Sequence, residues 1–220
     1  MHDWDFSFLT TQRHFILQGL LGTLRLAAVS LVAGTAIGLL GAAARLAGSV
    51  VPRVLGGFYV EFFRNIPVLV QIFWLYFSIP ILTGVQPNAY VAAAIATSLY
   101  GGAYLTEVFR SGIASIEKGQ WDGARAMGFG QVAMLRHVVL PQAFRRVLPA
   151  YTNQVLEIVK TTSVASTIAY AELLYSAKLL SEQEFRPIEA YTAVGVAFIL
   201  VLLPAGAVAR LMERRMARHG

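Results

Sequence analysis

Side chains that could take part in chemistry are scarce in this sequence, and they are most concentrated in the run Lys160-Thr161-Thr162-Ser163. A cation beside three hydroxyls can bind a carboxylate and replace its hydration. Glu157 lies three residues before Lys160, so on a helix the two share a face, and we expect Glu157 mainly to neutralise the lysine. The surrounding stretch is apolar, where a central charge costs ~2.5–3.5 kcal/mol, so these groups mark a candidate polar site. Its candidate residues are Tyr104, Asn153, Gln154, Glu157, Lys160, Thr161, Thr162 and Ser163.

No pattern of a self-contained enzyme accompanies this run. The chain has no cysteine, which excludes a thiol nucleophile and cysteine metal ligands. Ser163 has no histidine within a span to act as its base, and aspartate is absent from every membrane helix predicted below. We therefore predict no catalytic residue and no metal site. The histidines are scattered in loops and termini, where we expect them to be solvated: His2, His14, His137 and His219.

The composition indicates that much of the chain lies in lipid. Apolar residues make up 56% and charged residues 14% of 220 positions, whereas a soluble domain carries about 25% charged residues. The mean hydropathy is +0.60. The net charge of +6 comes from basic residues between the uncharged runs and at the C-terminus, as the positive-inside rule requires. Because no basic segment alternates with stacking aromatics, we predict no nucleic-acid partner.

Long uncharged runs predict an all-α integral membrane protein, with one domain over residues 1–220 and five membrane-spanning helices. Pro80, Gly84 and Pro87 divide the uncharged stretch 65–106 into two spans. Residues 172–189 are expected to form a loop. The predicted spans are 18–44, 55–82, 89–108, 147–168 and 190–209.

Three glycines of the first span, Gly34, Gly38 and Gly41, are four and three residues apart and share one helical face. This spacing permits close approach of a second helix, although small residues are also frequent in membrane helices generally.

Basic residues beside the spans predict the orientation. Arginines follow the first, third and fifth spans, whereas the turn at 82–88 has no basic residue. The predicted N-terminus is therefore outside and the C-terminus cytoplasmic, with a cytoplasmic loop at about 111–146. The basic residues after the last span are Arg210, Arg214, Arg215 and Arg218.

This cytoplasmic loop contains a predicted helix with a face suited to docking. Asp122 is expected in its first turn, where the helix dipole favours a carboxylate. Trp121, Ala124 and Gly128 recur at intervals of three and four residues and form a stripe of one large aromatic and two small residues. Such a stripe can pack into a groove on another protein. Pro141 is expected to end the helix and turn the chain toward the membrane.

The segment GQWDGARAMGFGQVAMLRHVVLPQA at 119–143 resembles the EAA loop of the permease subunits of ABC importers. In that pattern Glu-Ala-Ala is followed after three residues by Gly and, after nine more, by Ile-x-Leu-Pro. Asp122-Gly123-Ala124, Gly128, Val138 and Leu140-Pro141 stand at these positions, with Asp for Glu, Gly for Ala and Val for Ile as departures. Three further segments resemble polar-amino-acid permeases: FRNIPVLVQ at 63–71, GAYLTEVFR at 102–110, and the run from 148 to 163 with LP, Asn153 and KTTS.

The resemblance implies a type I ABC importer permease of the histidine, glutamine, arginine and glutamate kind, in a bacterial inner membrane. It implies a second permease subunit, the same or different, two ATP-hydrolysing subunits that bind ATP and Mg²⁺, and an extracytoplasmic amino-acid-binding protein. This chain has no G-x-x-x-x-G-K-[ST] run, so we expect it to bind no cofactor. The candidate polar site would belong to the substrate path. The residues expected to couple to the ATPase are Lys118, Gln120, Trp121, Asp122, Ala124, Met127 and Gly128.

Three alternatives stay open. The matches at 62–73 and 160–163 argue against a permease for another solute. An intramembrane enzyme would need a buried nucleophile and base, and a channel would not need the cytoplasmic loop. The carried amino acid, and whether this subunit or its partner holds the pocket, are not predicted.

Overall fold

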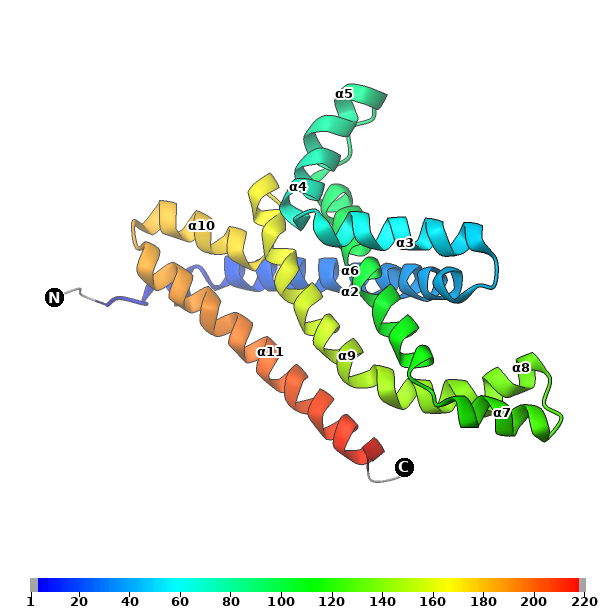
Figure 1. The fold of residues 1–220 in the computed structure, drawn as a ribbon. Helices are drawn as coiled ribbons and strands as arrows, with labels where there is room; N and C mark the ends of the chain where they lie inside the picture. The colour runs from blue at the N-terminus through cyan, green and yellow to red at the C-terminus, as the bar shows by residue number, and fades with distance from the viewer. Residues whose placement is uncertain (1–3, 218–220) are drawn as a thin grey trace.

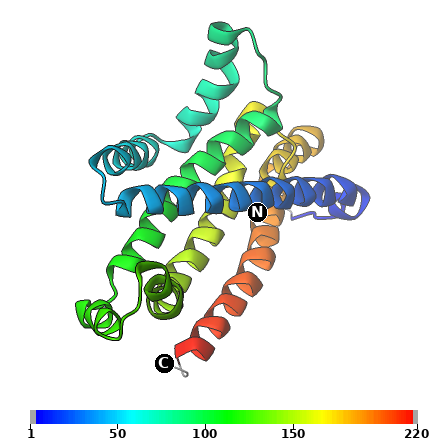
Figure 2. The same cartoon turned by 90° about the vertical axis from the view of Figure 1, so that its right-hand side faces the viewer.

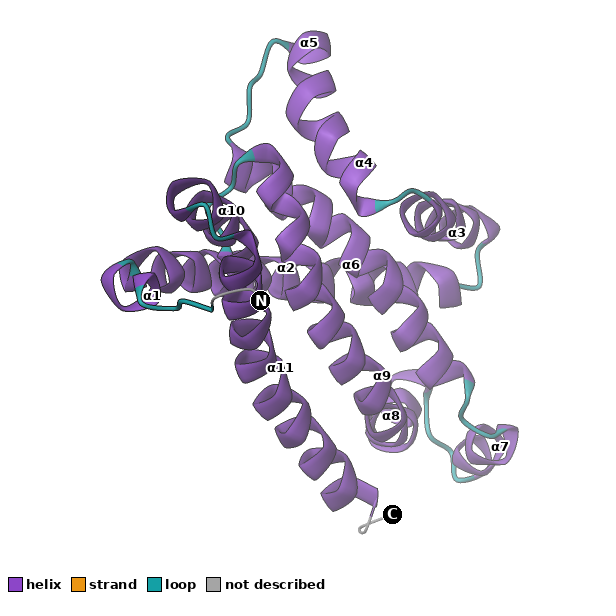
Figure 3. Cartoon of the chain, turned by 90° about the vertical axis from the view of Figure 1, so that its left-hand side faces the viewer, coloured by secondary structure: helices purple, strands orange, loops and turns teal. Residues whose placement is uncertain are grey.

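The structure is a computed structural model that describes residues 4–217, with side chains as far as Leu211. His2, Arg218 and His219 lie outside the described residues, as do the side chains of Arg214 and Arg215. Every regular element in this part of the chain is helical (Figures 1 and 3). In chain order these are α1 (Phe8–Thr11), α2 (Arg13–Leu46), α3 (Val50–Asn65), α4 (Val68–Phe73), the π-turn η1 (Trp74–Ser78), α5 (Ile79–Thr83), α6 (Ala89–Ala114), α7 (Lys118–Ala126), α8 (Gln131–Met134), the π-turn η2 (Leu135–Val139), α9 (Leu140–Thr161), the 3₁₀ segment η3 (Thr162–Ile168), α10 (Leu173–Glu184) and α11 (Pro187–Ala217).

Two described helices are individually long and apolar enough to cross a membrane, α2 and the Pro187–Leu211 part of α11. They contain the first and fifth predicted spans. The third predicted span lies within α6, whose alanines and glycines are mostly buried against other helices. Because these small residues face protein and not lipid, α6 needs fewer large apolar side chains.

The prediction of one helix over 55–82 is wrong, because α3 and the Val68–Thr83 run are bent by 100° relative to each other. Pro67 has no N–H and disfavours helical backbone at the residue before it. Ile66 is accordingly extended, with φ −95° and ψ 126°. Gln71 Nε2 donates to the carbonyls of Phe63 and Ile66, both at 2.9 Å, which satisfies backbone groups that the break leaves without helical partners.

The fourth predicted span, 147–168, is correct only in part. Helix α9 begins at Leu140, and the chain after Thr161 continues as 3₁₀ turns. The segment 172–189, predicted as a loop, contains α10, so that prediction is wrong. Glu172 starts this helix by accepting hydrogen bonds from the amides of Leu174 (2.9 Å) and Tyr175 (2.7 Å). Burial raises the pKa of the Glu172 carboxyl to about 7, against the opposing effect of these hydrogen bonds.

The core is built around the crossing of α2 and α6 (Figure 2). The predicted glycine face is confirmed, because Gly34, Gly38 and Gly41 all turn toward α6. A Cβ added at Gly34 would lie 3.3 Å from the Gly102 amide nitrogen, and one at Gly41 only 2.3 Å from the Thr106 hydroxyl. The two backbones are therefore in close contact, as in other small-residue helix pairs of membranes.

The helices group at two ends (Figure 1). At one end α1, α10 and the start of α11 share a cluster formed by Phe8, Leu180 and Ala190. At the other end α2 and α6 finish beside α7 and α8. Helix α11 starts beside α10 and runs to the C-terminus at the bottom of Figure 1.

Candidate functional site

The α7–α8 loop, defined as residues 115–139, is a compact unit held against the ends of α6 and α9. Its small core contains Ile116, Ala124, Met134 and Val139, packed on Ala143 of α9. Polar contacts add to this core, since Gln142 Nε2 donates to Gln120 Oε1 at 2.9 Å and an Arg146 guanidinium N–H donates to the Ser115 carbonyl. These contacts attach the loop to the C-terminal end of α6 and to the first turns of α9.

Gly128 ends α7 through its backbone geometry. Its φ is +78°, a left-handed conformation that costs a residue with a Cβ roughly 1–2 kcal/mol. The Gly128 amide donates to the Arg125 carbonyl at 2.9 Å, and the Phe129 amide donates to the Ala124 carbonyl at 3.1 Å. These two bonds make a Schellman motif, so Gly128 is a helix terminator and not a member of a helical stripe.

The three residues of the predicted docking stripe do not share one outward face. Ala124 is buried and Trp121 is half-buried, and both pack into the core of the loop. Asp122 lies beyond the first turn of α7, which contains no acidic residue, and pairs with Arg125 at 3.1 Å. Pro141 stands in the first turn of α9 and does not end a helix, because the π-turn η2 leads directly into α9 at Leu140.

The surface that the loop presents to its surroundings includes five of the seven residues predicted to couple to the ATPase. Lys118, Gln120 and Asp122 are exposed, as is Gly128. The tip carries two large apolar side chains, Met127 with 69% and Val132 with 79% of its surface exposed. Val132 was missed in the sequence, because its outward direction depends on the turn at Gly128. We call Met127 and Val132 the apolar tip.

A second group of candidate residues lies along α9. Lys160 Nζ donates to Glu157 Oε1, as expected, and both side chains are about half exposed, 50% and 57%. Asn153, one turn before Glu157, is also exposed, and Gln154 is half-buried. Charged and amide groups therefore form a polar face on a predicted membrane span, and such a face needs water or another protein and not lipid.

The three hydroxyls after Lys160 do not surround its ammonium group as predicted. Thr161, Thr162 and Ser163 each donate to a backbone carbonyl of the preceding turn, at 2.8, 2.7 and 2.7 Å. Thr162 is fully buried and cannot reach a solute. Side-chain bonds of this kind are common where serine and threonine follow a helix. A carboxylate at this site would therefore contact Lys160. The hydroxyls of Thr161 and Ser163 already donate to backbone carbonyls, so they offer the carboxylate no further donor.

Tyr104 lies in an aromatic and charged group contributed by three helices. The Arg64 guanidinium of α3 stands 4.8 Å from the centre of the Tyr104 ring, and the Tyr100 ring is 4.9 Å away. Tyr100 and Tyr104 lie on α6, which packs against α9, the helix that carries Glu157. The structure thus brings Tyr104 and Glu157 into one region and adds Arg64, which the sequence did not single out as a site residue.

An ionic cluster joins α2 and α6 at the end nearest the α7–α8 loop. Arg45 of α2 approaches Glu107 of α6 at 3.3 Å, and Arg110 contacts the same carboxylate at 2.7 Å. Of the described histidines, His14 and His137 are both exposed, as expected. Among the side chains that the structure describes, residues 4–211, no three from His, Asp or Glu come together as a metal site would require.

Comparisons with known proteins match nearly the whole chain. The family described as "Binding-protein-dependent transport system inner membrane component" matches residues 34–218. The probable amino-acid ABC transporter permease protein YckA of Bacillus subtilis is 33% identical over 220 residues, covering 98% of this chain and 97% of the relative. The arginine transport system permease protein ArtQ of the same species is 29% identical over 212 residues, covering 96% of this chain and 97% of the relative.

Solved structures have the same fold. A chain from the crystal structure of an amino acid ABC transporter with histidines superposes with a TM-score of 0.92 at 27% identity, covering 97% of this chain and all of the other. A chain from the MetNI methionine ABC transporter, in an inward-facing conformation, superposes with a TM-score of 0.77 at 18% identity, covering 96% of this chain and 99% of that chain.

Proposed function

The chain belongs to the family of binding-protein-dependent transport system inner membrane components, and on that premise we propose how it takes part in amino-acid import. It is a membrane-spanning permease subunit of an ABC importer and not itself an enzyme. Its relatives are named as permeases for amino acids, arginine and glutamine. A polar amino acid is therefore the cargo that we assign to it, in a bacterial inner membrane.

We propose five spans: α2, the bent pair α3 with α4–α5, α6, α9 with η3, and α11. The N-terminus is extracytoplasmic and the C-terminus cytoplasmic. The observation that supports this orientation is the cluster of Arg45 and Arg110 at the same end of the bundle as the α7–α8 loop. Basic residues gather on the cytoplasmic side of membrane proteins.

The α7–α8 loop is the element that we propose docks on an ATPase subunit. One observation carries this assignment: the loop is firmly joined to α6 and α9, yet its apolar tip is exposed. Exposed large apolar residues beside charged ones are typical of a protein interface. ATP and Mg²⁺ belong to the partner, and closure of two ATPase subunits would move α6 and α9 through this loop.

The polar face of α9 forms the substrate path in our proposal, facing a second permease subunit across a water-accessible space. Lys160 is the group that meets the α-carboxylate of the amino acid, and Glu157 and Asn153 offer acceptors for its ammonium group. Tyr104 and Arg64 line the same region. An extracytoplasmic binding protein delivers the cargo to this path.

The docking assignment is tested by changing the apolar tip. We expect Met127→Asp together with Val132→Asp to remove most of the co-purifying ATPase subunit, because charges replace apolar contact area. The measurement is the amount of ATPase that co-elutes with the tagged permease. The matched control is Val85→Asp, since Val85 is also exposed (66%) but lies in the turn between α5 and α6. Unchanged co-elution of the tip variant would refute the assignment.

A further inference from the structure

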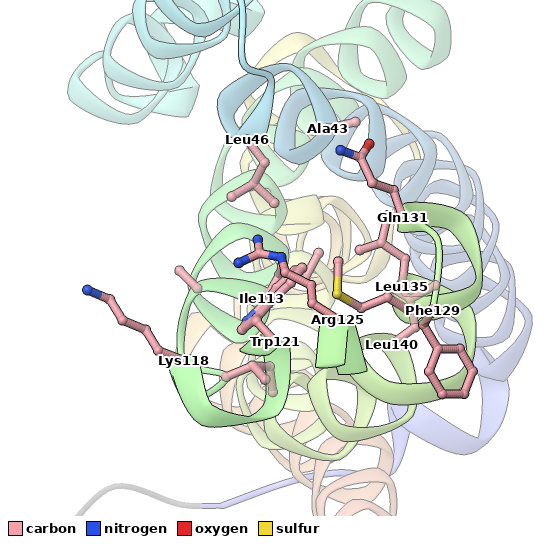
Figure 4. Close-up of a pocket in the computed structure, with 13 residues that line it drawn as sticks. Ala43, Leu46, Ile113, Lys118, Trp121, Arg125, Phe129, Gln131, Leu135 and Leu140 are labelled. Carbon is pink, nitrogen blue, oxygen red and sulfur yellow. The ribbon is translucent and has the colours of Figure 1, made fainter. Parts of the chain in front are cut away.

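A cavity is lined jointly by the α7–α8 loop and by the ends of α2 and α6. Its volume is about 720 Å³, within the range of cavities that bind small molecules. Ala43 and Leu46 of α2 form one wall, and Ile113 of α6 forms another. Leu135 and Leu140 close the side nearest α9 (Figure 4). Most of the lining is therefore apolar.

The charged residues among those lining this cavity are both cations, Lys118 and Arg125. Figure 4 shows the Arg125 guanidinium extended toward Leu46, whereas the Lys118 ammonium points away from the cavity at its rim. Arg125 contacts Asp122 through Nη1 at 3.1 Å, which occupies one of its five N–H donors. Its remaining donors can bind an anion. The exposed pair with Asp122 stabilises the protein only slightly, so it would compete weakly with such an anion.

The position of the cavity selects the class of ligand. If the orientation proposed above holds, the last residues of α2 and α6 lie at the cytoplasmic surface of the membrane. Anionic lipid headgroups lie at that surface and attract basic residues. A free phosphate would use the guanidinium but not the apolar walls, whereas a phospholipid would use both.

We propose that this cavity binds an anionic phospholipid of the inner leaflet, with its phosphate on Arg125 and an acyl chain against Leu46, Ile113 and Leu140. The lipid would lie between the membrane helices and the loop that docks on the ATPase. Lipid composition would thereby affect the contact between them. This inference rests on the proposed function for its orientation.

The experiment uses the purified complex of permease and ATPase subunits in bilayer nanodiscs. Two photoreactive probes with a diazirine on one acyl chain are compared, phosphatidylglycerol and phosphatidylcholine. Cross-linked peptides are mapped by mass spectrometry. We expect the phosphatidylglycerol probe to label the peptides around Ala43, Ile113 and Leu135 in preference to the neutral probe.

Two variants and one control sharpen the test. Arg125→Gln should lower this labelling about five-fold, the change expected when one basic residue near an anionic surface is lost. Ala43→Trp should lower the labelling by both probes, because the indole fills the cavity. Arg136→Gln removes an exposed charge of the same loop that does not line the cavity, and labelling should not change.

Equal labelling by the two probes, or labelling that neither Arg125→Gln nor Ala43→Trp reduces, would overturn the lipid site. Labelling that appears only after the ATPase is stripped away would also overturn it, because the partner would then occupy the cavity. The same samples report on the proposed function independently. A complex that keeps its ATPase but lacks labelling contradicts only the lipid site, whereas a permease that never retains an ATPase contradicts the importer.

Discussion

At Gly128 the requirement for glycine comes from the backbone and not from packing. Its φ of +78° lies in the left-handed region, and an added Cβ would meet nothing within 4 Å. We expect Gly128→Ala to strain the Schellman motif by roughly 1–2 kcal/mol and displace the apolar tip. In the assembled transporter, ATP hydrolysis should then lose most of its stimulation by the substrate-loaded binding protein, with membrane insertion unchanged. Gly128→Trp should have the same effect, more strongly.

Gly130→Ala is the matched control for this change. Gly130 is two residues away, has equally open surroundings, and adopts φ −66° and ψ 163°, which any residue can adopt. Its alanine variant should couple normally. Normal coupling in Gly128→Ala would show that the shape of this turn is not needed.

A substitution at Lys160 tests whether the polar face of α9 contacts the substrate. Its ion pair with Glu157 is about half exposed, so losing it should change stability by only ~0–1 kcal/mol. We expect Lys160→Gln to raise the KM for uptake at least ten-fold, because a charge-assisted contact to the carboxylate is lost. Lys178→Gln removes a similarly exposed lysine, paired with Glu182 on α10, and should leave uptake unchanged. Equal KM values for both variants would remove Lys160 from the path.

Side-chain identities were easier to predict than side-chain directions. The Glu157–Lys160 pair followed from helical spacing alone. The hydroxyls of Thr161 and Thr162 did not, because their bonds to the preceding backbone turn depend on rotamers. Trp121 was predicted to face outward and packs inward, since its direction depends on where the loop meets α9.

Among the elements, α2 is fixed in place by the chain that precedes α10. A Cβ at Gly22 would lie 2.0 Å from the Ala171 carbonyl oxygen, and the Tyr170 hydroxyl donates to the Gly22 carbonyl at 3.0 Å. We expect Gly22→Ala to destabilise the protein by roughly 1–3 kcal/mol, as overpacking does. Thermal unfolding in detergent should show a Tm several degrees lower.

The comparison for this variant is Gly195→Ala in α11. No heavy atom lies within 4 Å of the added Cβ there, and alanine is the better helix former. Its Tm should be equal or higher. A Gly22→Ala protein as stable as this control would show that α2 and the 171–172 segment are not in tight contact.

The existence of the two longest helices and one close helix contact could be predicted. Helices α2 and α11 followed from the length of the uncharged runs, and the close α2–α6 contact followed from Gly34, Gly38 and Gly41. The bend before α4 was missed although Pro67 signals it, because only Pro80, Gly84 and Pro87 were predicted to interrupt the uncharged stretch. Helix α10 was missed because its charged residues are also typical of loops. It is stabilised by the buried Glu172 cap and by apolar contacts, which depend on the tertiary structure.

For the whole molecule, α9 connects the α7–α8 loop at its start with the polar face near its end, with Pro149 inside the helix between them. The loop packs on the first turns of α9 through Ala143, and Lys160 lies near the end of the same helix. Movement of the loop on an ATPase would therefore reach the polar face directly. Length, composition and the 119–143 pattern predicted this class of machine, whereas the cargo depends on side chains that no spacing rule fixes.

We propose that this chain moves a polar amino acid only together with an ATP-hydrolysing partner. The most direct measurement is uptake into proteoliposomes that contain the permease, the ATPase subunits and the binding protein, using a panel of radiolabelled amino acids with and without ATP. We predict ATP-dependent accumulation of at least one polar amino acid and none by the permease alone. Uptake without ATP by the lone chain, as a channel would give, would contradict the account.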